Sequence, residues 1–417
     1  MAPAAPAIAL VGFMGAGKST AARAIASALG EGTADVDELI EAEAGRSIEE
    51  IFAGEGETAF RELEERIALG ALERGGVIAL GGGAVESDHV REALRDAVVV
   101  WCRVDADTAW SRCDGSGRPL ARDRHEFVRR FEAREPLYEA VSRAILPTGG
   151  AEAGALAAPW LATLREAPEV RLAWARTASA SYPVLVGTGA TGLIAREPLA
   201  PGRRRFAIAD RAAAEACGEL LPAVEDRVAV AGGEGSKTLG EAERVLEELA
   251  ELGVRRDDAL VAFGGGVVGD LGGFCAAVYQ RGIPVVQVPT TLVAQVDSAI
   301  GGKTGVDLPR AKNYVGAYHQ PAAVLADPAA LRTLPRAELA AGFAEVVKTA
   351  LIAGDSLWDR VRAIGEPTAE SVAPLVLDCA RTKIDVVAAD ERDAGLRAVL
   401  NLGHTVGHGI ETASGHG

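Results

Sequence analysis

One stretch, residues 257–312, constrains the fold more than any other part of the chain. It contains four Gly-rich or polar clusters, at 264–266, 269–270, 290–291 and 301–303. Short apolar runs at 259–263 and 283–288 precede the first and third clusters and predict buried strands. Where such strands enter helices through Gly-rich turns, backbone N–H groups can approach a pyrophosphate. The stretch therefore predicts an α/β domain that binds a dinucleotide.

Length and charge limit the class of protein. At 417 residues the chain is too long for one ordinary core, so two or three domains are expected. A formal charge of −16 argues against broad binding to nucleic acid or anionic membranes, because both need a basic face. The five cysteines are dispersed without CxxC or CxxH spacing, which is typical of reduced thiols in a cytoplasmic protein. No apolar run approaches the length of a membrane span, and the apolar start lacks a cationic leader.

A phosphate-binding loop lies near the start. Residues 12–20, GFMGAGKST, match GxxxxGK[ST] in full, between an apolar strand at 7–11 and a helical stretch. In such loops backbone N–H groups surround the phosphates, Lys18 reaches the β and γ phosphates, and the Ser19 hydroxyl ligates Mg²⁺. The residues expected at ATP are Gly15, Ala16, Gly17, Lys18, Ser19 and Thr20. The alternative is a chance Gly-rich turn, which would not explain the strand and helix around it.

The next segments indicate the phosphoryl acceptor. Asp35 and Asp37 end a second predicted strand. One carboxylate would hold Mg²⁺ through water, and the other would accept a proton from a hydroxyl. Arg61 and Glu64 are three apart on one predicted helix face, which suits an oriented Arg. The glycines at 81–83 follow a third strand and let backbone touch a small ligand.

An Arg-rich stretch at 112–134 follows. In an acidic chain, such a run beside a phosphate loop predicts a mobile lid that brings an Arg to the transferring phosphoryl group. The alternative is a solvated, Arg-rich helix, which we prefer for Arg122, Arg124, Arg129 and Arg130.

Together these motifs resemble shikimate kinase. GxxGxGKST, DxD, GExxFRxxE, GGG, RPL and RxPLY occur in this order over nearly all of residues 5–166. The resemblance implies that Asp37, Arg61, Gly82 and Arg134 hold shikimate. It further implies that Asp35 lies near Mg²⁺, that Arg118 is the lid Arg at ATP, and that Asp37 and Arg118 act in catalysis. Gluconate and adenylate kinases share the phosphate loop, but we do not expect them to carry the whole set.

The second half begins near residue 167, where a predicted amphipathic helix at 155–167 gives way to a stretch of mixed character at 168–181. Further apolar runs at 182–186, 205–209 and 227–231 predict strands that alternate with helices. This alternation indicates a doubly wound α/β domain. From 336 to 393 the periodicity is helical, so a helical layer is expected after the sheet.

Groups that can do chemistry lie on that helical layer. Glu345 and Lys348 are three apart on one predicted helix face. His404 and His408 are four apart, and with a Glu from another helix they would make a divalent-metal site. The alternative for a bare HxxxH is a pair of histidines with ordinary hydrogen bonds.

The second half resembles 3-dehydroquinate synthase through GGEGSK, GGGVVGDLGGF, QRG, VPTTLVAQVDSAIGGKTGV, AGFAEVVK, DERDAGLR and LNLGHTVGH. The NAD⁺ contacts that this resemblance implies are Gly233, Glu234, Lys237, Gly266, Val267, Val268, Gly269, Asp270, Thr290, Thr291, Lys303, Lys312 and Thr333. The implied contacts to the sugar phosphate are Arg281, Asp297, Lys303, Asn313, Lys348, Lys383, Arg397 and Asn401. Glu345 and His404 would be metal ligands, while Lys348, Lys383 and a proton-handling His408 would be catalytic.

The implied reaction converts 3-deoxy-arabino-heptulosonate 7-phosphate to 3-dehydroquinate and phosphate. NAD⁺ transiently oxidises a ring hydroxyl held by Zn²⁺ or Co²⁺, phosphate leaves, hydride returns, and the ring opens and recloses by an aldol step. The Lys and Arg set agrees with a substrate that carries both a phosphate and a carboxylate. Because NAD⁺ is recycled, the net chemistry is that of a lyase.

The end of the sequence departs from this family. The family takes a third metal ligand from a His in an HGEAV motif beyond the position of His404, and the sequence stops at Gly417. We therefore divide the chain into 1–166, 167–327 and an incomplete helical domain, 328–417. His416 is not expected to be the missing ligand. With Glu345 and His404 alone, we expect weak metal affinity and little synthase turnover.

Two alternatives apply to the second half. A metal-dependent polyol dehydrogenase would share the fold, but an uncharged polyol has no need of Lys303, Lys312, Lys348 and Arg397. A half that only binds NAD⁺ would act as a scaffold or dimerisation module. The leading hypothesis is a bifunctional enzyme with small-molecule substrates, no nucleic-acid or membrane partner, and any contact between copies made through the second half.

Overall fold

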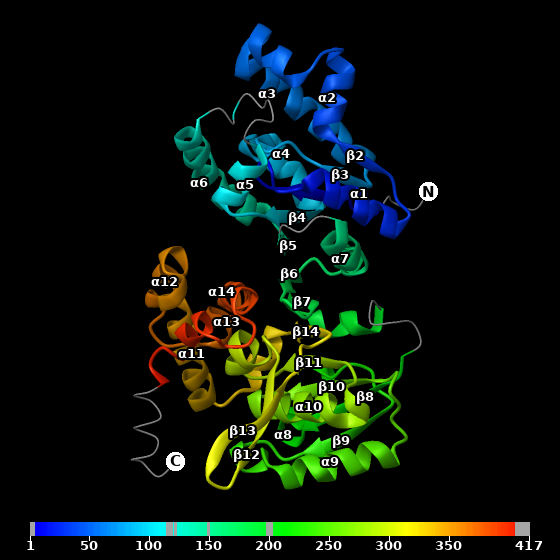
Figure 1. Cartoon of the computed structure of the whole chain (residues 1–417), viewed down its shortest axis with the longest axis vertical. Coiled ribbons are helices and arrows are strands. Elements are labelled where there is room, and N and C mark those ends of the chain that lie inside the picture. Colours follow the sequence, from blue (N-terminus) through cyan, green and yellow to red (C-terminus); the bar gives the residue numbers. More distant parts are fainter. Residues whose placement is uncertain (1–4, 114–119, 121–122, 148–150, 197–202, 405–417) are drawn as a thin grey trace. The chain divides into compact units, whose positions relative to one another are not determined.

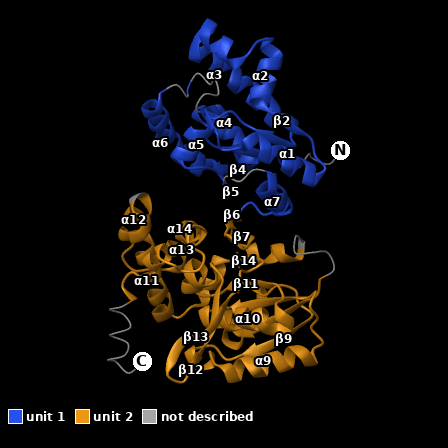
Figure 2. Cartoon of the chain, in the orientation of Figure 1, with its two compact units in different colours: residues 1–168 blue, residues 169–417 orange. Residues whose placement is uncertain are grey.

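The computed structural model describes residues 5–113, 120, 123–147, 151–196 and 203–404. The chain forms two compact units, residues 1–168 and 169–417 (Figure 2). Among the described residues, no helix combines the length and the apolar character needed to cross a membrane.

The first unit contains a parallel sheet with the strand order β2-β3-β1-β4-β5 (Figure 1). The strands are β1 (Ile8–Val11), β2 (Thr33–Asp35), β3 (Val77–Ala79), β4 (Val98–Arg103) and β5 (Ala144–Pro147). The central strands β1, β3 and β4 are almost wholly buried, because helices cover both faces of a parallel sheet and leave no solvated side. The strands predicted before the phosphate loop and before the Gly triplet are therefore confirmed as β1 and β3.

The helices of the first unit connect these strands. They are α1 (Lys18–Leu29), α2 (Val36–Ala44), α3 (Ile48–Arg74), α4 (Asp88–Ala93), α5 (Ala106–Cys113), α6 (Arg124–Val141) and α7 (Ala151–Leu164). The predicted position of Asp37 at a strand end is wrong, because β2 stops at Asp35 and Asp37 lies in the first turn of α2. The Asp35 side chain caps α2 by accepting a hydrogen bond from the Asp37 N–H at 3.0 Å, which starts the helix early.

The second unit contains a larger sheet with the strand order β6-β7-β14-β11-β10-β8-β9. The strands are β6 (Arg171–Arg176), β7 (Ser181–Val186), β8 (Arg205–Asp210), β9 (Asp226–Val230), β10 (Ala259–Gly264), β11 (Val285–Pro289) and β14 (Ala323–Ala326). All neighbours pair in parallel except β6, which runs antiparallel to β7. The stretch of mixed character before residue 181 thus contains a strand that the sequence does not predict. Its short buried centre is flanked by an exposed arginine at each end.

A separate hairpin and several helices complete this unit. The hairpin pairs β12 (Lys303–Leu308) with β13 (Ala311–Tyr318). Helices α8 (Arg211–Cys217), α9 (Leu239–Glu251) and α10 (Gly266–Val278) alternate with the strands, and α10 packs against both the sheet and β12. A dinucleotide-binding α/β architecture accounts for this alternation.

The helical layer predicted from residue 336 is present as α11 (Arg336–Ala353), α12 (Asp355–Arg362), α13 (Ala369–Val372) and α14 (Val376–Ala389). Its apolar side chains share one core with β7, β14 and the π-helical turn η7 (Ala294–Ser298). Val346, Val376 and Ile384 belong to that core, which fixes the polar faces of α11 and α14 towards η7.

Candidate active sites

The phosphate loop ends where α1 begins. Its last glycine, Gly17, is the N-cap residue of α1 in the left-handed conformation (φ +84°), and it provides no side-chain cap. The N-terminus of α1 therefore faces the loop without a side-chain cap, and its partial positive charge favours an anion there. The Lys18 ammonium donates to the carbonyl oxygens of Gly12 at 2.9 Å and Phe13 at 3.1 Å, so it lies folded over the loop.

One cavity of about 630 Å³ joins this loop to the predicted acceptor residues. Its lining includes the predicted residues Gly15, Gly17, Lys18, Ser19, Thr20, Asp35, Asp37, Arg61, Gly82 and Arg134. Ala16, in the same loop, is buried and does not line the cavity. Arg118 and Arg122 lie outside the described residues. Groups from β2, α2, α3, α6 and two loops thus meet in one place.

The Gly triplet makes room for a charged pair on α3. Arg61 Nη1 donates to Glu64 Oε2 at 2.5 Å, and Glu64 is only 2% exposed. Burial raises the pKa of the Glu64 carboxyl above its usual range, although the Arg61 guanidinium opposes the shift. A Cβ at Gly83 would lie 2.1 Å from Arg61 Nη1, and one at Gly81 would lie 2.0 Å from Glu64 Oε1. A side chain at either position would displace this pair.

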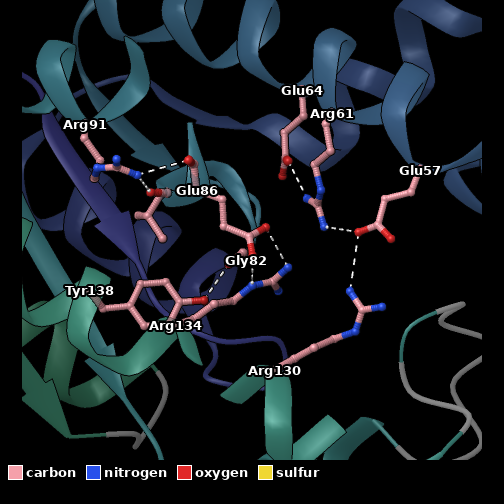
Figure 3. A network of polar contacts seen from close by, with 10 residues as sticks. Glu57, Arg61, Glu64, Gly82, Glu86, Arg91, Arg130, Arg134 and Tyr138 are labelled. Atoms are coloured by element: carbon pink, nitrogen blue, oxygen red, sulfur yellow. Dashed lines mark hydrogen bonds and ion pairs between the residues drawn. The ribbon is translucent and has the colours of Figure 1, made fainter. Parts of the chain in front are cut away.

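Helix α6 supplies the second arginine (Figure 3). Arg134 is 2% exposed, and its Nε and Nη2 donate to Glu86 Oε1 at 3.1 Å and Oε2 at 2.9 Å. One helical turn later, the Tyr138 hydroxyl donates to the Gly82 carbonyl oxygen. The sequence motifs do not predict a role for Glu86. Its only sequence signal is a carboxylate three residues beyond the Gly triplet.

The Arg-rich helix divides into exposed and inward-pointing residues. Arg124 and Arg129 are exposed and pair with Asp107 and Glu126, both at 2.6 Å, as the solvated alternative predicts. Arg130, which is 31% exposed, in addition points inward: its Nη1 donates to Glu57 at 3.4 Å, and Glu57 also accepts from Arg61 at 3.1 Å (Figure 3). The cause is helical spacing, since Arg130 and Arg134 are four residues apart and share a face.

In the second unit, parallel strands bring the Gly-rich segments to one edge of the sheet. Strands β8, β9, β10 and β11 all end there, and Thr290 N donates to the Gly264 carbonyl oxygen at 2.9 Å. Helix α10 starts after Gly265, which provides no side-chain cap. A Cβ at Gly265 would lie 2.9 Å from Thr291 Cγ2. This backbone edge fits the pyrophosphate of a dinucleotide, because nothing larger than glycine could stand there.

Three predicted cations beside this edge have acidic partners. Lys237 is 4% exposed and donates to Asp270 Oδ2 at 2.5 Å and to Asn313 Oδ1. Lys312 lies 3.9 Å from Glu234, and Lys303 pairs with Asp393. Burial raises the pKa of the Asp270 carboxyl, although Lys237 opposes this shift. The Lys237 and Lys312 contacts connect the Gly-rich edge to the β12–β13 hairpin, and the Lys303 pair connects the hairpin to the segment after α14.

A cavity of about 1240 Å³ lies beside the hairpin and the helical layer. The predicted residues that line it are Glu234, Asp270, Asp297, Lys303, Lys312, Asn313, Glu345, Lys348, Lys383, Arg397, Asn401 and His404. The predicted residues outside its lining are Gly233, Lys237, Gly266, Val267, Val268, Gly269, Arg281, Thr290, Thr291 and Thr333. Most of the latter belong to the predicted NAD⁺ set, and Arg281 is the one predicted sugar-phosphate contact among them.

Asp297 stands at the centre of the polar cluster in this cavity. Its Oδ2 accepts from Lys348 at 2.7 Å, and Lys383 donates to both its Oδ1 and, at 2.7 Å, its carbonyl oxygen. Burial would raise the pKa of the Asp297 carboxyl, but the Lys383 and Lys348 ammonium groups hold it well below its usual range. Burial lowers the pKa of Lys383, whereas for Lys348 the carboxylates of Asp297 and Glu345 outweigh burial and raise it.

Two predicted metal ligands approach each other in the same cavity. Glu345 Oε1 lies 3.9 Å from His404 Nε2, and both donor types suit a divalent metal such as Zn²⁺. Within the described ranges, no group of three potential His, Cys, Asp or Glu ligands is found. His408 and His416 lie outside the described residues. The pair thus fits two positions of a metal coordination sphere.

Arg397 is buried like Lys348 and Lys383, but within the described residues its guanidinium donates to backbone carbonyl oxygens and not to a carboxylate. Its guanidinium donates to the carbonyl oxygens of Glu391 at 2.6 Å and Gly301 at 3.1 Å. These bonds tie the segment after α14 to the turn before β12. The residue lines the cavity, but part of its donor capacity serves the backbone.

Family comparisons agree with this division of the chain. The shikimate kinase family model matches residues 14–165, and the N-terminal and C-terminal 3-dehydroquinate synthase models match residues 227–341 and 342–417. The 3-dehydroquinate synthase of Symbiobacterium thermophilum is 49% identical over 248 residues, covering 56% of this chain and 69% of its own length. That of Halorhodospira halophila is 46% identical over 259 residues, covering 58% and 71%.

Solved structures support the fold of the second unit. A 2-deoxy-scyllo-inosose synthase structure is 29% identical, with a TM-score of 0.52, and covers 59% of this chain and 72% of its own. A 2-deoxy-scyllo-inosose synthase complexed with carbaglucose-6-phosphate, NAD⁺ and Co²⁺ is also 29% identical, with a TM-score of 0.50, covering 58% and 69%. The chain therefore belongs to the 3-dehydroquinate synthase family, with a shikimate kinase domain fused before the synthase part.

Proposed function

We infer that the protein is a bifunctional enzyme of the shikimate pathway. Its first unit transfers the γ-phosphoryl group of ATP to shikimate, giving shikimate 3-phosphate and ADP. Its second unit converts 3-deoxy-arabino-heptulosonate 7-phosphate to 3-dehydroquinate and phosphate. The observation that carries this conclusion is that the predicted kinase residues line one cavity, and most of the predicted sugar-phosphate and metal residues line another.

In the kinase pocket, the start of α1 and Lys18 bind the phosphates, and Ser19 ligates the Mg²⁺ that accompanies ATP. Asp35, which caps α2, lies near that ion. Arg61 and Arg134 bind the acceptor carboxylate from two helices, because a carboxylate accepts paired hydrogen bonds from guanidinium groups. Asp37 accepts the proton of the attacking hydroxyl. The lid role of Arg118 stays a prediction.

Beside the synthase cavity, the Gly-rich strand ends and the first turn of α10 would hold NAD⁺, whose nicotinamide accepts and returns a hydride when bound. Lys303, Lys312 and Asn313 approach from the hairpin and bind the anionic groups of the substrate. Lys348 and Lys383, fixed by Asp297, orient and move protons at the sugar phosphate. Asn401 and Arg397 close the wall formed by the helical layer.

Glu345 and His404 would hold the divalent metal, Zn²⁺ or Co²⁺, which acidifies a bound hydroxyl. The proton-handling role of His408 and the Arg281 and Thr333 contacts stay predictions. The polyol dehydrogenase and the NAD⁺-binding scaffold are not favoured, because four lysines and Arg397 line the cavity and the relatives are synthases.

Two assays test the function. Purified protein with ATP, Mg²⁺ and shikimate should give equal amounts of ADP and shikimate 3-phosphate. With NAD⁺ and Zn²⁺ or Co²⁺, the heptulosonate phosphate should release phosphate and yield 3-dehydroquinate in equal amounts. ADP formation that does not depend on shikimate contradicts the first assignment. Phosphate release without 3-dehydroquinate contradicts the second.

Several finer assignments complete this proposal. We divide the chain into a kinase domain (1–166), an NAD⁺-binding domain (167–327) and a helical domain (328–417). All five cysteines are buried and free, which supports a cytoplasmic location. The charge of −16 supports the absence of nucleic-acid and membrane partners. Any association of copies is assigned to the second unit, and sedimentation of each unit expressed separately would test this assignment.

A further inference from the structure

Each of the two arginines of the kinase pocket pairs with a carboxylate, but only one of these two carboxylates lines the cavity. Glu64, the partner of Arg61, lines the cavity. Glu86, the partner of Arg134, is absent from the cavity lining in the part of the chain that the structure describes. It is 45% exposed, whereas Arg134 is 2% exposed. Glu86 thus contacts Arg134 from outside the pocket.

The pairing fixes the plane of the Arg134 guanidinium. Glu86 uses both carboxylate oxygens, which accept from Nε and Nη2 (Figure 3). A fork of two parallel hydrogen bonds allows little rotation of either group. Within the described residues, neither bond uses Nη1, so this nitrogen stays available on the other edge of the guanidinium. The Arg134 carbon Cζ also lies 5.8 Å from the centre of the Phe13 ring, which belongs to the phosphate loop.

Glu86 is itself held rigidly. It ends the 3₁₀ turn η1 (Ala84–Glu86), where its N–H donates to the Gly83 carbonyl oxygen at 2.9 Å. Arg91 Nη1 donates to the carbonyl oxygens of Val85 at 2.6 Å and Glu86 at 3.0 Å. Because Tyr138 on α6 bonds to Gly82, the same loop is joined to α6 at two points one turn apart.

We propose that Glu86 is a positioning residue that aims Arg134 at the carboxylate of the phosphoryl acceptor. This inference rests on the proposed kinase function. With Glu86 in place, the free edge of the guanidinium meets the acceptor already oriented, so little rotational freedom is lost on binding. Without it, a buried guanidinium keeps its charge but loses its fixed plane. Glu86 acts on acceptor affinity and does not touch the reacting atoms.

The test compares Glu86→Gln and Glu86→Asp with the wild-type chain in the shikimate-dependent ADP assay. For Glu86→Gln we expect the KM for shikimate to rise about 10-fold, which is about 1.4 kcal/mol, with kcat and the KM for ATP unchanged. Glu86→Asp keeps the charge and should recover part of the loss. Glu92→Gln is the matched control, because Glu92 pairs with Arg95 on the surface. It should change nothing.

Two further measurements distinguish a positioning role of Glu86 from a merely structural one. One uses a second acceptor and the other a second variant. Shikimate with its carboxylate reduced to a primary alcohol should show no KM difference between wild type and Glu86→Gln. In an Arg134→Lys background, Glu86→Gln should add no further loss. An unchanged or lower KM in Glu86→Gln overturns the proposal, as does a lower melting temperature with unchanged KM. A wild-type chain without shikimate-dependent activity would instead refute the proposed function.

Discussion

The most buried cations of the two cavities are neutralised in opposite ways. In the kinase pocket, Arg134 is paired with Glu86 from outside the cavity, which leaves one edge of the guanidinium for the acceptor. In the synthase cavity, Asp297 lines the wall and lies between Lys348 and Lys383. The anionic substrate therefore meets lysines that are already paired with a carboxylate of the cavity wall. Additional positive charge comes from Lys303 and Lys312, which are 48% and 53% exposed.

The two predicted phosphate-binding segments, by contrast, have the same kind of helix start. Helices α1 and α10 both begin after a glycine that provides no side-chain cap. Gly17 adopts φ +84°, whereas Gly265 is extended (φ −74°, ψ −172°). Different backbone turns thus present the N-terminus of a helix, with its partial positive charge, to an anion. The comparison shows that the recognition of phosphate is common to the units, and the placement of charged side chains is not.

The largest expected effect separates the two activities. Lys18→Met should lower shikimate-dependent ADP formation by about 10³-fold, because the transferring phosphoryl group loses a cation inside a closed site. The affinity of the chain for NAD⁺, followed by fluorescence titration, should not change. A Lys18→Met chain that keeps wild-type turnover, or that loses NAD⁺ binding, would contradict the independence of the two sites.

A substitution at the centre of the synthase cluster should cost stability in one unit only. Asp297→Asn leaves Lys383 and Lys348, both 6% exposed, without their shared carboxylate. We expect a loss of about 3 kcal/mol in the free energy of unfolding of the second unit, measured by denaturation. Glu370→Gln, which breaks an exposed pair with Arg332, is the control and should cost less than about 1 kcal/mol. Equal destabilisation by both variants would contradict the central role of Asp297.

Ligands should stabilise the units selectively. ATP with Mg²⁺ should raise the unfolding temperature of the first unit, and NAD⁺ that of the second. At 100 times the dissociation constant, each ligand should add about 2.7 kcal/mol. Differential scanning calorimetry on the full chain, with trypsin cleavage to assign the transitions, measures both effects. A single transition that responds equally to both ligands would show that the units do not unfold independently.

The close approach of Arg61 to the Gly triplet predicts a smaller effect. In Gly83→Ala, the new Cβ would lie 2.1 Å from Arg61 Nη1, so the guanidinium has to move away from the acceptor. We expect the KM for shikimate to rise about 10-fold, or about 1.4 kcal/mol, in steady-state assays. Gly70→Ala on α3 meets only the Arg74 side chain, at 3.6 Å, and should leave the KM unchanged. An unaltered KM in Gly83→Ala would show that Arg61 does not need this position.

The smallest effect is a pH dependence confined to the first unit. Hydrogen bonds from Arg165 lower the pKa of Glu31 below its ordinary value of 4.5. A carboxylate whose pKa is lowered in the folded state stabilises the fold at pH values above its unfolded-state pKa. This stabilisation is lost as the pH falls through the folded-state pKa. Below about pH 4.5, the free energy of unfolding of the wild-type chain should therefore fall by up to about 1 kcal/mol. Glu31→Gln lacks this contribution at every pH. Parallel stability curves of the two chains from pH 7 to 3 would contradict this contribution.

Sequence reasoning succeeded where local chemistry dictates the backbone. The phosphate loop, the Gly-rich strand ends and the buried strands were predictable, because apolar runs and glycines act within a few residues. It failed at β6, whose buried centre is flanked by Arg171 and Arg176, and at Asp37, which the Asp35 cap draws into a helix. It also missed Glu86 and the inward contact of Arg130, since their partners are 48 and 73 residues away.

The sequence by itself thus determined which anions this protein binds: glycines before helices expose N–H groups whatever surrounds them, and the motifs place lysines and arginines nearby. Only the tertiary structure decided which carboxylate neutralises each cation. Arg134 pairs with Glu86 from outside its pocket, and Lys348 and Lys383 share Asp297 inside theirs. The physical reason is that a buried charge must find a partner, and packing of distant elements selects that partner from many acidic residues.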